Sequence, residues 1–181
     1  DAVPRLIEAR PELRFLLVGQ GPLRAATELR VAESGLADYV RLPGFRPDLG
    51  DFIGCFDILV HPALDEGLGV VLLETSAAGV PIVAARAGGI PEAVRDGVNG
   101  LLVPPDEPAA LVDAILRLAV GSALRARKAL HSSDGRGCQR WREISPGGAR
   151  RFLVGFAGVL TMGDMLAPVL ASAVIAYLLE G

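Results

Sequence analysis

The sequence predicts an α/β domain in which helices cover both faces of a parallel sheet. Two observations predict it: short apolar runs alternate with amphipathic stretches over residues 1–120, and Gly or Pro marks the boundaries between them. The 181 residues, 51% of them hydrophobic, suffice for one such domain with its own core. The chain begins with Asp, and its only methionines are Met162 and Met165, so we expect an internal piece of a longer protein.

The first half of the chain alternates predicted helices and strands. A helix through Leu6 stops before Pro11, and RFLLVG at 14–19 is typical of a buried strand. The helix predicted over 23–34 has apolar residues at every third position, which indicates a buried stripe. Those residues are Leu23, Ala26, Leu29 and Ala32. The elements predicted next are a strand over 39–42 that ends at Pro43 and Gly44, a short helix over 48–54 and a strand over 57–61.

The second half of the domain continues the same alternation. The strand over 57–61, DILVH, is mostly apolar, as is typical of a central parallel strand. A loop follows, and then a helix over 70–78 with Gly79 as its C-terminal cap. The elements predicted after it are strand 80–84, a short helix from Pro91, strand 101–103 and a helix capped by Asp106 whose buried face carries Leu111, Val112, Ile115, Leu116 and Ala119.

After Leu124 this pattern fails. We therefore divide the chain into a domain over 1–124, an irregular basic linker over 125–151 and an apolar helical tail over 152–181. Together the two apolar runs of the tail exceed the roughly 20 residues that span a bilayer, and Arg150 and Arg151 before them would keep the N-terminal side in the cytoplasm. We expect residues 152–179 either to contact a membrane or to form an apolar hairpin on the domain.

Charge and cysteine content exclude several classes of function. Residues 1–124 carry 10 basic and 17 acidic side chains, a balance of −7, whereas 125–181 carry 8 and 4, a balance of +4. An acidic domain argues against nucleic-acid binding, which needs a basic stripe to neutralise phosphates. Cys55 and Cys138 are too few for a disulfide framework or a four-thiolate zinc site, and no ligand spacing connects them with the two histidines, so no metal site is expected.

The segment richest in candidate functional groups is HPALDEGLGVVLLE at 61–74. Glu66 and Glu74 are separated by seven residues, and glycines between them begin a helix whose N-terminus offers unpaired N–H groups to a phosphate. In a doubly wound sheet, this loop at the carboxyl end of a strand is where ligands bind. His61 is expected to be packed or hydrogen-bonded rather than catalytic. Gly88 and Gly89 indicate a tight turn or a close backbone approach.

In this region the chain resembles the C-terminal, donor-binding half of retaining GT-B glycosyltransferases of the group 1 type, which carry a Glu-x7-Glu motif. The resemblance covers about residues 3–120 and includes LLVGQGP at 16–22, VRLPGFRPDL at 40–49 and EGLGVVLLETSAAGVPIVAARAGG at 66–89. It implies a Rossmann-like fold and transfer of a sugar from a nucleotide-diphosphate sugar to an acceptor with retention of configuration. More loosely, residues 162–181 resemble the first membrane helix of an autoinducer-2 exporter-type permease.

The resemblance also implies a role for individual residues. Glu66 would contact hydroxyls of the donor sugar as the catalytic residue, and Glu74 would bind the ribose of the nucleotide. No metal or other cofactor is implied. The remaining donor-binding residues would be Gly67, Leu68, Gly69, Val70 and Val71 beside the sugar and diphosphate, Gly19 beside the nucleotide, and Arg46, whose main chain would border the base.

The departures from the family pattern qualify this assignment. Ahead of the matched region, such proteins carry an Arg and a Lys that grip the diphosphate, and an N-terminal acceptor domain; this sequence has neither, so we expect it to be inactive alone. Three alternatives remain open: a sugar-nucleotide epimerase of GT-B architecture, a membrane-protein fragment, and a binding module without turnover. A frameshift between Leu124 and Arg140 would explain the change of pattern there. The expected location is the cytoplasm, at the inner face of the plasma membrane if the tail binds lipid.

Overall fold

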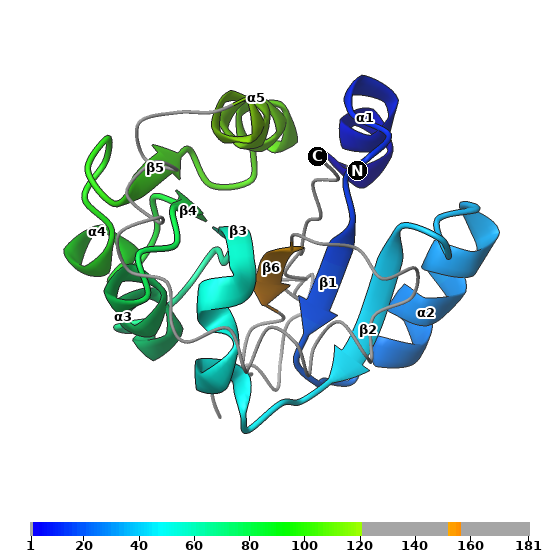
Figure 1. Ribbon diagram of the computed structural model, residues 1–181, viewed down its shortest axis with the longest axis horizontal. Coiled ribbons are helices and arrows are strands. Elements are labelled where there is room, and N and C mark those ends of the chain that lie inside the picture. Colours follow the sequence, from blue (N-terminus) through cyan, green and yellow to red (C-terminus); the bar gives the residue numbers. More distant parts are fainter. Residues whose placement is uncertain (1, 121–151, 157–181) are drawn as a thin grey trace.

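The computed structural model describes residues 2–120 and 152–156, and within them a six-stranded parallel sheet lies between two layers of helices and turns (Figure 1). The strands follow the order β2-β1-β6-β3-β4-β5, and every neighbouring pair is parallel. The elements are α1 (Ala2–Ala9), β1 (Phe15–Val18), α2 (Arg24–Glu33), β2 (Val40–Gly44), the 3-10 turns η1 (Leu49–Asp51) and η2 (Ile53–Cys55), β3 (Phe56–His61), α3 (Val70–Ala77), β4 (Ile82–Ala85), α4 (Ile90–Ala93), β5 (Gly100–Val103), α5 (Pro108–Ala119) and β6 (Phe152–Phe156). The predicted fold class is confirmed.

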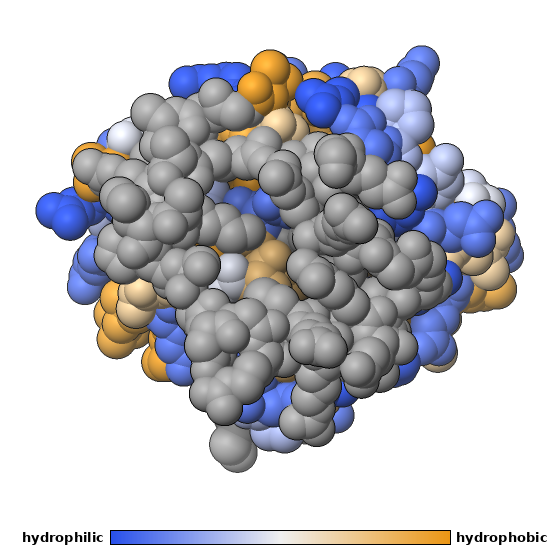
Figure 2. Space-filling model, in the orientation of Figure 1, coloured by the Kyte–Doolittle hydropathy of each residue, from blue (hydrophilic) through white to orange (hydrophobic). Residues whose placement is uncertain are grey.

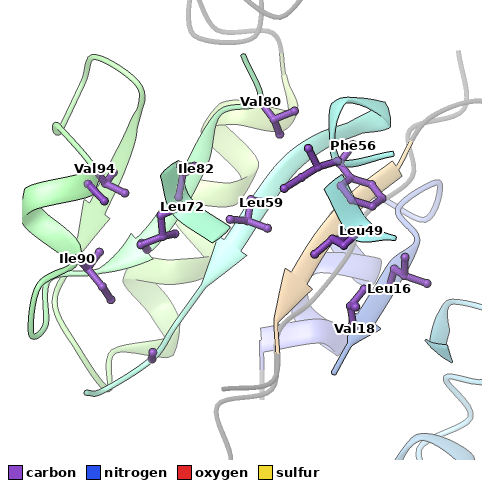
Figure 3. Close-up of a cluster of buried hydrophobic side chains, with 14 of the residues drawn as sticks. Leu16, Val18, Leu49, Phe56, Leu59, Leu72, Val80, Ile82, Ile90 and Val94 are labelled. Carbon is purple, nitrogen blue, oxygen red and sulfur yellow. The ribbon is translucent and has the colours of Figure 1, made fainter. Parts of the chain in front are cut away.

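Alternate side chains of the strands enter two separate cores. On one face, Leu16 of β1 and Leu59 of β3 pack with Leu72 of α3 and with residues of η1, η2 and α4 (Figure 3). On the other face, Phe15 and Ile58 pack with residues of α1 and α5. This period of two follows from the pleat of a strand, and it explains why β3 is buried at all six positions. The sheet is therefore covered on both sides, as the sequence predicted.

The parallel arrangement brings the carboxyl ends of β1, β2 and β3 to one edge of the sheet. β2 is one of the two outermost strands of the described sheet, which explains why Pro43 is tolerated inside it, although the sequence predicted the strand to stop there. Strand β3 ends at His61 and leads directly into the loop before α3. The segment with the two glutamates thus lies at the edge predicted for a ligand.

The predicted buried stripe of the second helix is wrong. No residue of α2 is buried, Leu29 is 59% exposed, and hydrophobic surface lies over α2 at the right-hand edge of Figure 2. A repeat of three residues drifts by about 60° per step on an α-helix, so Leu23, Ala26, Leu29 and Ala32 spread over half its circumference. The helix contacts the rest of the domain through the half-buried Val31, which packs against the core, and through Arg24, whose guanidinium donates to the Leu42 carbonyl at 3.0 Å.

The predicted cap of the last helix is also wrong. Asp106 has a φ of +57°, and the residue that precedes α5 as its N-cap is Glu107. Pro108 takes the first helical position, where its missing N–H costs nothing, and this places the helix start one residue later than expected. Gly79, with φ of +71°, does follow α3 in the left-handed conformation expected for a cap.

The C-terminal prediction needs a further correction at residues 152–156. They form strand β6 between β1 and β3 rather than the start of an apolar helix. An apolar run suits a buried parallel strand as well as a buried helix, and composition does not distinguish the two. The linker over 125–151 and the predicted membrane contact of 157–179 lie outside the described residues. Over 2–120 and 152–156, no helix has the length and apolar character needed to cross a membrane.

Candidate functional site

The candidate site is built around the loop at 62–69 and the first turn of α3. Gly69 precedes the helix as its N-cap with φ of +64°, and no side chain among the described residues caps the amides of the first turn. This left-handed conformation favours glycine, and a Cβ there would also lie 2.7 Å from Leu72 Cδ1, so that side chain would have to shift. Gly67 differs, because a Cβ built on it would meet no atom within 4 Å. The helix therefore presents uncapped N–H groups beside an open position in the loop.

Glu66 is held by His61 at the end of β3. The imidazole Nε2 lies 3.0 Å from Oε2 of Glu66, which confirms the expectation that this histidine is hydrogen-bonded. His61 is 2% exposed, whereas the Glu66 side chain is 27% exposed and reaches the surface. Burial lowers the pKa of His61, and the Glu66 carboxylate opposes that shift by attraction and hydrogen bonding. His61 is thus neutral at pH 7.

A second contact fixes the backbone of the loop. The Gly89 amide donates to the Glu66 carbonyl oxygen at 2.8 Å. A Cβ on Gly88 would lie 2.2 Å from that oxygen, and a Cβ on Gly89 would lie 1.9 Å from the carbonyl oxygen of Gly67. The close backbone approach expected of these glycines is therefore confirmed. The contacts of Gly88 and Gly89 with Glu66 and Gly67 form a clamp that holds the loop against the turn before α4.

Glu74 lies one turn into α3 and is exposed. In the described part of the chain, no hydrogen bond or ion pair holds its carboxylate, so it is available to a ligand. The next residue, Thr75, is fully buried, and its hydroxyl donates to the Val71 carbonyl at 2.6 Å. Thr75 thus satisfies its polar group within its own helix and leaves Glu74 on the outer face.

The predicted nucleotide side of the site lies at the ends of β1 and β2. Gly19 has φ of +132°, and its N–H donates to the Gly44 carbonyl at 2.9 Å, so these two strand ends lie side by side. The Arg46 guanidinium makes two hydrogen bonds to the Asp48 carboxylate, at 2.9 and 2.7 Å, and that contact raises the pKa of Arg46. The side chain of Arg46 is therefore engaged by Asp48, and its carbonyl accepts a hydrogen bond from the Leu49 amide at 3.3 Å.

The charges around the loop are mainly acidic. No Lys or Arg occurs between Arg46 and Arg86 in the sequence, and His61 is neutral. Any anion at the first turn of α3 would therefore meet backbone amides and the helix dipole from this segment. Among the residues that the structure describes, no group of three or more His, Cys, Asp or Glu side chains could hold a metal ion.

Residues 1–120 match the family model described as "Glycosyl transferases group 1". The chain belongs to this family. Its sequence is 36% identical over 154 residues to a D-inositol 3-phosphate glycosyltransferase of Streptomyces avermitilis, covering 77% of this chain and 32% of the relative. It is 34% identical over 117 residues to the amylovoran biosynthesis glycosyltransferase AmsK of Erwinia amylovora, covering 60% and 29%. The chain spans about a third of the length of these relatives.

Solved structures share the fold of this domain. Anabaena Alr3699/HepE in complex with UDP and glucose superposes with a TM-score of 0.54 at 31% identity, covering 69% of this chain and 35% of that one. The C-terminal domain of the group 1 protein LpcC from Francisella tularensis superposes with a TM-score of 0.61 at 26% identity, covering 80% and 77%. The second match spans most of an isolated C-terminal domain, and so supports the GT-B half predicted from the sequence.

The sequence predicted the loop and helix of the candidate site but not the contacts within it. It found both glutamates, the glycine cap and the two strand ends. It did not reveal that the Gly89 amide binds the Glu66 carbonyl, or that His61 binds the Glu66 side chain. The spacing of five residues from His61 to Glu66, across the end of a strand, is compatible with contact, but only the loop conformation brings the two groups together.

Proposed function

We propose that residues 2–120 form the donor-binding domain of a retaining glycosyltransferase that takes a nucleotide-diphosphate sugar. Glu66 contacts hydroxyls of the sugar, and Glu74 accepts hydrogen bonds from the ribose. Amides of the 67–71 segment border the sugar and diphosphate, while Gly19 and the main chain of Arg46 border the base. The observation that carries the proposal is the position of Glu74, which is exposed one helical turn into α3. Within residues 2–120 and 152–156 nothing pairs with its carboxylate or caps the first amides of the helix, and Glu66 beside them is held by His61.

The chemistry of the candidate site and the ligands of a related protein both support a nucleotide-diphosphate sugar as the donor. A helix N-terminus binds phosphate through N–H groups and its dipole, and a carboxylate binds paired ribose hydroxyls. Structures of Anabaena Alr3699/HepE, at 31% identity, are described as complexes with UDP and glucose and with UDP-glucose. UDP and UDP-glucose are therefore the first probes to use on this chain.

The transfer itself requires groups beyond residues 2–120. In the proposed reaction the bond from the anomeric carbon to the diphosphate breaks, and its electron pair leaves on the nucleoside diphosphate. An acceptor oxygen then bonds to the same face of the sugar, and its proton leaves with the diphosphate. Because the 47–85 segment has no Lys or Arg, cations from elsewhere must stabilise this leaving group. We therefore propose that this chain binds donor without transferring sugar, and that an N-terminal acceptor domain completes the enzyme.

The test is calorimetry of the 181-residue chain with UDP. Glu74→Gln keeps the size of the side chain but removes its charge, and loss of hydrogen bonds to a charged acceptor should weaken binding about 10- to 100-fold. Glu33→Gln is the matched control, because Glu33 is an exposed glutamate at the end of α2. Equal affinity of Glu74→Gln and the unaltered chain would refute the ribose role. Sugar transfer by the isolated chain would refute its inactivity.

A further inference from the structure

His61 is a buried titratable group that the proposed function leaves unused. Its side chain is 2% exposed at the end of β3, directly before the site loop. Only one of its two ring nitrogens has a hydrogen-bond partner within the described residues: Nε2 meets Glu66, while Nδ1 is buried without one. A leucine or valine would fill such a position without an unsatisfied polar atom, so packing alone does not account for a histidine here.

The partner of Nε2 determines which nitrogen carries the proton. An ionised carboxylate only accepts hydrogen bonds, so Nε2 must donate its N–H to Oε2 of Glu66. Protonating Nδ1 as well would bury an N–H that has no acceptor among the described residues, which is costlier than burying a lone pair. The lowered pKa of His61 agrees with a neutral ring. The residue is thus a neutral imidazole with its proton on Nε2.

We propose that His61 is a positioning residue for Glu66: by donating its Nε2–H to Oε2, it fixes the carboxylate so that the other oxygen accepts hydrogen bonds from a hydroxyl of the bound sugar. This role rests on the proposed function of Glu66. The 27% exposure of the Glu66 side chain leaves part of it accessible from the surface, and the Gly89 amide holds its backbone at the carbonyl. Glu66 is therefore held at both its main chain and its side chain. A carboxylate that presents one oxygen to a ligand needs such positioning.

The test compares two substitutions that differ in one hydrogen-bond donor. In His61→Gln the amide nitrogen lies four bonds from Cα, as Nε2 does, so it can donate to Glu66. His61→Leu fills a similar volume and cannot donate. UDP and UDP-glucose are titrated into the full chain and both variants by calorimetry, because a defect in Glu66 acts on the sugar and not on the nucleotide.

We expect His61→Gln to bind UDP-glucose within about threefold of the unaltered chain, and His61→Leu at least tenfold more weakly, with UDP binding unchanged in both. Unchanged UDP-glucose affinity in His61→Leu, or equal losses for UDP and UDP-glucose, would overturn the positioning role. If the unaltered chain binds neither probe, the proposed function fails, and the role of His61 toward a sugar fails with it.

A second measurement does not depend on a ligand or on the folding of the leucine variant. Nitrogen NMR of the unaltered chain at pH 7 should show His61 with one protonated and one unprotonated ring nitrogen, the proton residing on Nε2. The chain has only two histidines, so His131→Gln leaves the His61 signals to be read alone. A proton on Nδ1, or a doubly protonated ring, would overturn the geometry on which the inference rests.

Discussion

Replacing Gly89 by alanine tests the clamp that holds the site loop. The new Cβ would lie 1.9 Å from the Gly67 carbonyl oxygen, and real Cβ atoms essentially never approach within 3.0 Å, so the two backbones must separate by at least 1.1 Å. A shift of that size along the bond from the Gly89 amide to the Glu66 carbonyl would stretch it from 2.8 Å to about 3.9 Å and break it. Because φ at Gly89 is −82°, alanine is not strained by conformation, and the contact alone is responsible.

The expected cost is the sum of two effects. Loss of the hydrogen bond removes about 1 kcal/mol, and forcing atoms into a packed contact adds about 1–3 kcal/mol. We therefore expect Gly89→Ala to lower the free energy of unfolding by about 2–4 kcal/mol, measured by urea denaturation, and also to weaken UDP-glucose binding by the folded protein.

Two glycines provide the controls for this experiment. Gly50→Ala should change stability by less than about 0.5 kcal/mol, since its Cβ would meet nothing within 4 Å. Gly100→Ala should destabilise comparably, because its Cβ would lie 2.4 Å from the Ile82 carbonyl oxygen, but should leave the affinity of the folded protein intact. A Gly89→Ala protein as stable as the unaltered chain would show that this backbone contact does not stabilise the loop.

Two further measurements test the open position at Gly67 and the neutral state of His61. Gly67→Ala should leave the urea midpoint unchanged, because its Cβ meets no atom within 4 Å, yet weaken UDP-glucose binding measurably; full affinity would show that no ligand approaches this position. Burial lowers the pKa of His61 beneath its usual value near 6.5, so the unfolded chain binds more protons below that pH. The resulting stability should be complete above about pH 6.5 and disappear as the pH falls through the folded pKa. Urea titrations from pH 7.5 to 5.5 should show a steeper loss for the unaltered chain than for His61→Gln, and parallel curves would contradict a neutral His61.

The sequence predicted most of the elements of the domain because their signals are local. The apolar run of β3, the glycine after α3 and the glycine before it each reflect conformation or burial within a few residues. The same local signals failed where position in the fold matters. The apolar residues of α2 did not indicate that this helix is exposed. The apolar run at 152–156 suited a helix as well as a strand, and only its place between β1 and β3 decided that it forms β6.

The candidate site shows the same division. The spacing of Glu66 and Glu74, and the glycines between them, predicted a helix that starts after glycine with a carboxylate one turn inside it, and the structure has both. Phosphate binding at this helix start stays a prediction. The pairing of Glu66 with His61 depended on how the loop folds back over the end of β3. The contact of Glu66 and Gly67 with Gly88 and Gly89 joins residues more than 20 positions apart, and no local pattern encodes it.

Local patterns were enough to predict the family, the order of strands and helices along residues 2–120, and the residues that begin and end α3, because glycine conformation and apolar periodicity act over one or two turns. Long-range packing set the place of β6 between β1 and β3, the exposure of α2, and the contacts of Glu66 with a buried imidazole and a distant amide. Those outcomes depend on which backbone groups are brought together when the sheet assembles. Hydrogen bonds between distant segments produce no periodic pattern in the sequence, so they could not be predicted from it.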